Sequence, residues 1–143
     1  MSKKHFLWIF VIAVILYFAS VYLRAYRWEK ETEEYMEAAI FDVAKPWDCK
    51  KFEGRASWWL REKSKLTPCE IVDMSKNDFG NLIELAGPTK CNIQQGHDKY
   101  SREKHSYAIC VATLRMDKKS VVMEIRLVQE NSDWKINDFI SVN

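Results

Sequence analysis

Glycine, proline and histidine are scarce in this chain of 143 residues, and their scarcity excludes several classes of site. The four glycines lie at positions 54, 80, 87 and 96, too far apart for a glycine-rich loop that cradles a phosphate. The sequence contains no CxxC, HExxH or GxSxG motif, and its three histidines are His5, His97 and His105. Because zinc sites and serine nucleophiles need such spacings, the sequence predicts no metal, no cofactor and no catalytic motif.

An excess of charge of one sign is also absent. Lysine and arginine number 22, aspartate and glutamate number 20, and the formal net charge is +2. Proteins that bind nucleic acid through its phosphates usually carry a basic field. The balance therefore argues against a nucleic-acid partner, and the length predicts one domain with one core.

A long uncharged run occupies the N-terminal region. Residues 6–23, which begin at Phe6 and end at Leu23, contain no charged side chain. As a helix they would extend roughly 27 Å, close to the hydrocarbon thickness of a bilayer. Tyrosine, tryptophan and basic residues flank the run, as they do in membrane-spanning helices. We therefore expect a single-pass anchor within residues 1–27 and a soluble domain over residues 28–143.

A cleaved signal peptide is the alternative for this segment, since Lys3 and Lys4 would form its basic region. The run exceeds the usual apolar region of a signal peptide, and no small-x-small cleavage site precedes Arg24. Basic residues on both sides leave the orientation undecided by the positive-inside rule. Cysteines at 49, 69, 91 and 110 all lie in the soluble part, and an even number suits an oxidising compartment, with buried reduced thiols as the alternative.

Two helical patterns follow the anchor. Apolar residues three to four apart run from Trp28 to Val43, with glutamates between them, which predicts an amphipathic helix that Pro46 limits. A solvated helix face explains these glutamates better than a metal or a basic partner. Residues 48–63 predict a second helix, in which Trp58 and Trp59 cannot both face the core. We expect one of them in the core and the other either packed on a neighbouring helix or facing a partner.

A third helix has the clearest local signal. Thr67, Pro68 and Glu70 match an N-cap, a first-turn proline and the third residue of a capping box. Ser75 and Asp78 offer a restart within this helix, and apolar residues up to position 85 continue its stripe. Residues 86–88 supply the stop.

Beyond position 88 the apolar period changes from 3.6 to 2. We expect four strands, at residues 89–95, 105–116, 120–130 and 134–142, with turns at 117–119 and 131–133. In the third strand Glu124 and Arg126 should face water while the alternate residues face the core: Val121, Met123, Ile125 and Leu127. The fold class is therefore α+β, with helices packed on an antiparallel sheet of about four strands.

The first two strands bring two cysteines together. If the hairpin is centred near Tyr100, Cys91 pairs almost directly with Cys110. Cross-strand Cβ atoms about 4.5–5.5 Å apart are slightly too distant for a disulfide, but the closer non-hydrogen-bonded register can accommodate one. The alternative is a pair of reduced, neighbouring core thiols.

Helices precede a twisted sheet in this chain, and the last strand begins at Asp133 and Trp134. This arrangement resembles that of the nuclear transport factor 2-like superfamily of cone-shaped domains. More narrowly, the chain looks like small membrane-anchored bacterial proteins of that superfamily that lack a defined activity. This likeness lies in the segments 47–48, 55–57 and 85–88 and in the closing Trp134-Lys135-Ile136. The resemblance implies a helix packed into a curved sheet, often with an internal pocket. Members include isomerases, dehydratases, secretion-system subunits and partner-binding modules, so the fold alone does not choose a function.

An isomerase-like member needs an acid or base inside the cone. The resemblance offers His105, Tyr107, Glu124 and Asp138 for that role. We favour a non-enzymatic interaction module, a subunit or accessory of an envelope assembly at the bacterial inner membrane, with its domain in the periplasm and a protein partner. The alternative is a small-ligand carrier or isomerase-like enzyme that uses the interior of the cone.

Overall fold

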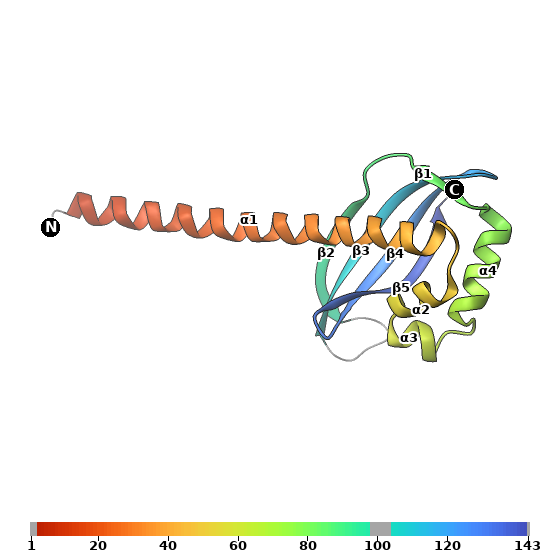
Figure 1. The fold of residues 1–143 in the computed structure, drawn as a ribbon. Helices are drawn as coiled ribbons and strands as arrows, with labels where there is room; N and C mark the ends of the chain where they lie inside the picture. The colour runs from red at the N-terminus through yellow and green to blue at the C-terminus, as the bar shows by residue number, and fades with distance from the viewer. Residues whose placement is uncertain (1–2, 98–103, 143) are drawn as a thin grey trace.

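The computed structural model describes residues 3–97 and 104–142, and it has the expected α+β architecture (Figure 1). Within the described residues, helices come first and an antiparallel sheet follows. The elements in chain order are α1 (Lys3–Ala44), α2 (Cys49–Arg55), α3 (Trp58–Glu62), α4 (Pro68–Phe79), β1 (Leu82–Leu85), β2 (Lys90–His97), β3 (Lys104–Met116), β4 (Ser120–Glu130) and β5 (Asp133–Val142). The four expected strands appear as β2 to β5, with bounds that differ by two residues or fewer.

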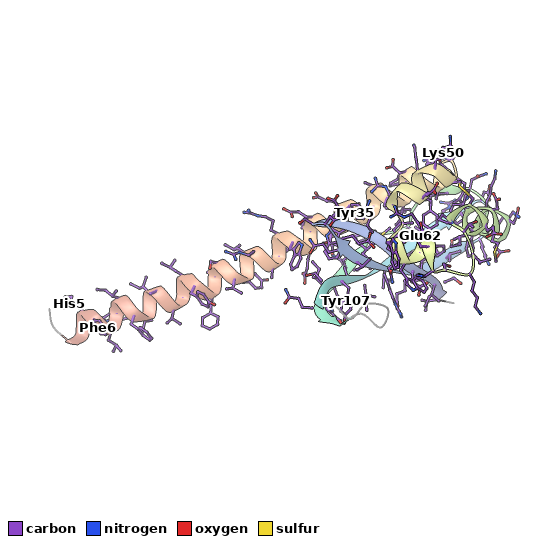
Figure 2. All side chains as sticks on the ribbon, turned by 90° about the horizontal axis from the view of Figure 1, so that it is seen from below. His5, Phe6, Tyr35, Lys50, Glu62 and Tyr107 are labelled. Atoms are coloured by element: carbon purple, nitrogen blue, oxygen red, sulfur yellow. A yellow bond between two sulfur atoms is a disulfide. The ribbon has the colours of Figure 1, made fainter. Side chains whose placement is uncertain are left out.

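A single helix of 42 residues, α1, joins the apolar run to the domain. Its first half projects away from the rest of the molecule (Figure 1), and the side chains of that half extend from the helix without touching the domain (Figure 2). In the described part of the chain, this helix is long and apolar enough to cross a membrane. Its second half buries one face against the sheet, through Met36, Ala39, Ile40 and Val43.

The expectation of one helix over residues 48–63 is wrong, because the structure has two short helices with a break at Ala56 and Ser57. These two residues leave the helix to pair with β5. Ala56 forms a parallel bridge to Ile136, and the Ser57 N–H donates to the Ile136 carbonyl at 2.8 Å. Ser57 then starts α3, since its side chain accepts from the Leu60 N–H. A tertiary contact thus overrides the helical pattern.

The predicted capping box of α4 is confirmed. The Thr67 hydroxyl accepts from the Glu70 N–H at 3.3 Å, and the Glu70 carboxylate accepts from the Thr67 N–H at 2.7 Å. The predicted restart at Ser75 is wrong, because α4 runs unbroken to Phe79.

The expected extension of α4 to position 85 is also wrong. Gly80 follows the last residue of α4 with a φ of 79°, a conformation that side chains disfavour and that turns the chain out of the helix. Leu82–Leu85 then form β1, which pairs with β3 near Met116. Four apolar-rich residues fit either a helix or a strand, so periodicity alone could not separate them.

The sheet has the strand order β1-β3-β4-β5, and β2 also pairs with β3, all antiparallel. The predicted alternation in β4 is confirmed, because its inward residues are buried: Val121, Met123, Ile125 and Leu127. Helices α1 to α4 lie on the same side of the sheet (Figure 1). The core therefore lies between that helical layer and one face of the sheet.

Trp58 and Trp59 point in different directions, as the sequence required. Trp59 packs against the core, whereas Trp58 is 52% exposed. The Lys63 ammonium lies 5.5 Å from the centroid of the Trp58 ring, a distance at which a cation and an aromatic face attract.

Candidate functional site

The interior of the domain contains a small apolar cavity of about 60 Å³ between α1, α2, α4 and the sheet. Ligand pockets commonly measure about 300–1,000 Å³ and place a few polar groups around the ligand. Here the lining is apolar except for Ser75 and the indole N–H of Trp47, which donates to the Gly80 carbonyl at 2.7 Å. Its main apolar contributors are Met36, Ile40, Phe52, Val72, Ile125 and Phe139.

Three of the candidates from the sequence, Tyr107, Glu124 and Asp138, are absent from this lining. Tyr107 alternates with inward-facing Ala108 in β3 and so lies on the opposite face of the sheet, where its hydroxyl donates to the Gln94 side chain at 2.6 Å. Glu124 lies on that same face and accepts from Arg126 at 3.0 Å. The backbone of His105 pairs with Gly96 in the β2–β3 ladder, but its side chain is outside the described residues.

Asp138 lies two positions after Ile136, so regular alternation would put both on one face of the sheet, but a β-bulge prevents this. Ile136 pairs with Leu127, but Asp138 pairs with Arg126, so Asn137 is an extra residue in β5. The bulge turns Asn137 inward and Asp138 outward, because an inserted residue reverses the alternation of side chains. No local sequence signal marks this bulge.

Asn137 is a buried polar residue that the sequence reasoning did not single out. It is 6% exposed, and its side-chain oxygen accepts from the Ser57 hydroxyl at 2.9 Å. Ser57 also caps α3, so the pair joins α3 to β5 across 80 positions of sequence. This is a structural hydrogen bond within the core.

The opposite side of the sheet carries a mixed surface that we call the open face, defined by Ile109, Val111, Val122, Glu124, Arg126, Asp138, Ile140 and Val142. The register places these side chains in adjacent rows of β3, β4 and β5. Val111, Ile140 and Val142 are 41%, 46% and 50% exposed. No described helix covers this face (Figure 1). The Glu124–Arg126 ion pair is therefore surrounded by apolar side chains, several of which are exposed to solvent.

The edge formed by β2 is occupied by carboxylates of α1. The Glu37 carboxylate accepts from the Thr89 N–H at 3.2 Å, and the Glu33 carboxylate accepts from the Cys91 N–H at 3.4 Å. The expectation that these glutamates simply form a solvated face is wrong for these two residues. Outward N–H groups of an edge strand invite another strand. Glu33 satisfies one such group within β2, and Glu37 satisfies the N–H of the residue just before the strand.

The edge formed by β5 is also partly occupied. Ala56 and Ser57 pair with Ile136, and the Asp138 carboxylate accepts from the Phe139 N–H at 2.9 Å. Strand addition is thus hindered at these positions of both edges, whereas no described helix covers the open face.

The structure joins Cys91 and Cys110 in a disulfide, in the register that the sequence suggested. Their Cα atoms are 4.0 Å apart, and Cys110 is fully buried. Because the Cys91 N–H points away from β3 toward Glu33, this is a non-hydrogen-bonded pair, the closer of the two kinds of antiparallel pair.

A second disulfide, Cys49–Cys69, was not assigned from the sequence. It connects the first turn of α2 to the first turn of α4, with Cα atoms 4.8 Å apart. Its pairing depends on how two separate helices pack, so sequence spacing gave no indication of it.

Tyr35, Asp42 and Arg55 form an interhelical cluster between α1 and α2. The Arg55 guanidinium pairs with the Asp42 carboxylate and lies 5.1 Å from the centroid of the Tyr35 ring. Burial raises the pKa of Tyr35, while the hydrogen bond from Arg55 lowers the pKa of Asp42. Figure 2 shows Tyr35 beside the body of the domain, far along α1 from Phe6. The cluster fixes α2 against α1.

The described residues contain no group of three or more His, Cys, Asp or Glu side chains placed to hold a metal ion. Comparison of the chain with protein-family models, curated proteins and solved structures finds no match.

Proposed function

We propose that this chain is a single-pass membrane protein whose soluble domain is a non-enzymatic interaction module, a subunit or accessory of a bacterial envelope assembly. The open face is the observation that carries the proposal. It presents exposed apolar side chains on the sheet, while the opposite face of that sheet is buried by the helices. Exposed apolar patches of this kind are typical of contact surfaces.

The anchor is supported by the exposed apolar side chains of α1. Phe6, Trp8, Leu16 and Phe18 are each more than 60% exposed in the isolated chain, which would be costly in water and is favourable in lipid. The helix continues without a break from these residues into the core of the domain. An uncleaved anchor accounts for this continuity better than a signal peptide does.

A periplasmic location is supported by the two disulfides, because oxidising compartments allow such bonds to persist. The resemblance to anchored bacterial members of the nuclear transport factor 2-like superfamily supports an inner-membrane position for the helix. Both parts of the localisation belong to the proposal.

The chemistry of the open face favours a protein partner. Its charged residues are Glu124, Arg126 and Asp138, and Glu124 and Arg126 already pair with each other. An anionic bilayer or a nucleic acid would require a basic surface. A folded protein surface with apolar side chains and a hydrogen-bond donor for Asp138 fits this face better.

The alternative, an isomerase-like enzyme or a small-ligand carrier, needs an acid or base inside a cavity of adequate size. The apolar cavity has a volume of about 60 Å³, and Tyr107, Glu124 and Asp138 do not line it. The interior therefore offers this alternative little support.

The anchor is tested by washing membranes that contain the full chain with alkaline carbonate. A spanning helix should keep the protein in the membrane pellet, since carbonate removes peripheral contacts. Release into the wash, or a mature N-terminus near residue 25, would contradict the anchor. Protease added from the periplasmic side should digest the domain, and protection there would contradict the orientation.

The interaction module is tested by purifying the tagged full chain from detergent-solubilised membranes after crosslinking in cells. The open-face variant Val111→Lys/Ile140→Lys should lose the crosslinked protein partner. The matched control, Met74→Lys/Ile83→Lys, replaces two apolar residues that are 51% and 44% exposed outside that face and should retain it. A wild-type protein that emerges alone, or equal crosslinking by both variants, would refute the proposal.

A further inference from the structure

The two disulfides of the domain differ in their exposure to a reactant. Cys110 is 0% exposed, and its partner Cys91 is half-buried, with its backbone N–H donating to Glu33 of α1. By contrast, Cys69 is exposed and Cys49 is half-buried. Thiol–disulfide exchange requires a thiolate to approach one sulfur in line with the bond that breaks. Cys69 offers such an approach from solvent, whereas Cys110 does not.

The position of the exposed disulfide allows it to break without disrupting the sheet. It connects α2 with α4, two surface helices outside the strand ladders. Both helices contribute to the wall of the apolar cavity, through Phe52 of α2 and through Ile71 and Val72 of α4. The bond therefore joins two helices that each line the cavity, while the Cys91–Cys110 bond lies within the sheet.

We propose that Cys49–Cys69 is a thiol–disulfide exchange site whose substrate is the thiolate of a CxxC dithiol protein, with Cys69 as the sulfur that is attacked. This site is separate from the open face and does not depend on its partner. In the first step the substrate thiolate forms a bond to the Cys69 sulfur. The Cys49–Cys69 bond breaks, and Cys49 leaves as a thiolate that takes a proton from water.

The second thiolate of the dithiol completes the exchange. It attacks the substrate sulfur of the mixed disulfide, and Cys69 leaves as a thiolate. The domain gains two electrons and ends with two thiols, while the dithiol loses two electrons and ends as a disulfide. A dithiol is favoured over a monothiol because its second sulfur is already held near the mixed disulfide. Reduction frees α4 from its covalent connection to α2.

The test uses the full chain in detergent micelles, isolated with both disulfides intact. It is incubated under native conditions with either a reduced CxxC oxidoreductase or reduced glutathione, quenched in acid and alkylated. Peptide mapping then gives the rate for each pair. Cys49 and Cys69 should become alkylated at least about tenfold faster than Cys91 and Cys110, since reaction rate follows the accessibility of the sulfur.

The two thiol sources give different products. Glutathione should appear after the acid quench as a minor mixed disulfide on Cys69 and not on Cys49, because the neighbouring Cys49 thiolate re-forms the original bond. The dithiol protein should instead release both thiols, since its second sulfur completes the exchange. Equal rates for the two disulfides, faster reduction of Cys91–Cys110, or glutathione found on Cys49 would each overturn the proposal. Faster reduction by glutathione than by the dithiol, at equal thiol concentration, would overturn the assigned substrate class. These measurements use the wild-type chain, so a misfolded variant cannot produce them.

Discussion

The indole ring of Trp28 on α1 packs against the ring of Trp134 at the start of β5, with the ring centroids 6.0 Å apart. Trp28 lies five residues after Leu23, the end of the uncharged run. The proposed membrane anchor and the core of the domain are thus joined by one helix and meet at this aromatic pair. No break in the helix separates the apolar run from the domain.

Trp28→Ala should remove this packing and lower the free energy of unfolding of the domain by about 1–3 kcal/mol, since a partly buried aromatic contact is lost. Thermal unfolding of the full chain in detergent, followed by circular dichroism, measures the effect. Tyr26→Ala is the matched control, because Tyr26 is 54% exposed on the same helix. Equal stability of the two variants would contradict the importance of the pair.

Glu33 should protect the N–H of Cys91 in β2 from solvent, and Glu37 should protect the N–H of Thr89 just before that strand. In the double variant Glu33→Ala/Glu37→Ala we expect the amides of Thr89 and Cys91 to exchange hydrogen about tenfold faster, because each loses its acceptor. Hydrogen exchange with peptide-level mass spectrometry measures this change.

The control for that experiment is Glu29→Ala/Glu34→Ala, which removes the same charge from exposed positions of α1. Exchange in β2 should then match the wild type. A similar acceleration in both variants would indicate a general effect of charge or helix propensity rather than two specific hydrogen bonds.

Ser57→Ala should destabilise the domain more than Thr67→Ala. Both substitutions remove a helix cap, at about 1 kcal/mol each. Ser57→Ala also leaves the buried Asn137 oxygen without its donor, which adds about 1–3 kcal/mol. Chemical unfolding of the full chain in micelles compares the two variants, and an equal loss would show that Asn137 finds another partner.

The Asp42–Arg55 pair should make stability depend on acid pH. The hydrogen bond from Arg55 lowers the pKa of Asp42 in the folded state, so the stabilisation is complete above the ordinary pKa of 3.8 and is lost as pH falls through the lowered value. Asp42→Asn should therefore reduce the loss of melting temperature between pH 7 and pH 3. Part of that loss should remain, because its hydrogen bonds with Thr67 also lower the pKa of Glu70.

Asp73→Asn serves as the control for the acid measurement, since Asp73 is exposed on α4. Its melting temperature should fall with acidification as that of the wild type does. An unchanged acid profile in Asp42→Asn would show that the ion pair does not contribute to folding stability.

Local signals in the sequence identified those features that depend on neighbouring residues. The uncharged run at 6–23, the capping box at Thr67 and the strand alternation of β4 each require only short-range chemistry, and the structure has all three. The register of Cys91 with Cys110 was accessible for the same reason, because a hairpin pairs residues about equally distant from its turn.

Features that depend on distant parts of the chain were missed. The break at Ala56 and Ser57 requires Ile136 as a pairing partner, and the Cys49–Cys69 bond requires α2 to pack beside α4. The β-bulge at Asn137 reversed the side-chain alternation of β5 and so moved Asp138 to the open face. The sequence by itself determined an apolar helix followed by an α+β domain, since hydrophobic period and caps are local properties. Only the tertiary structure decided which polar side chains face the core and which face solvent, because one inserted residue changes the face of every residue beyond it.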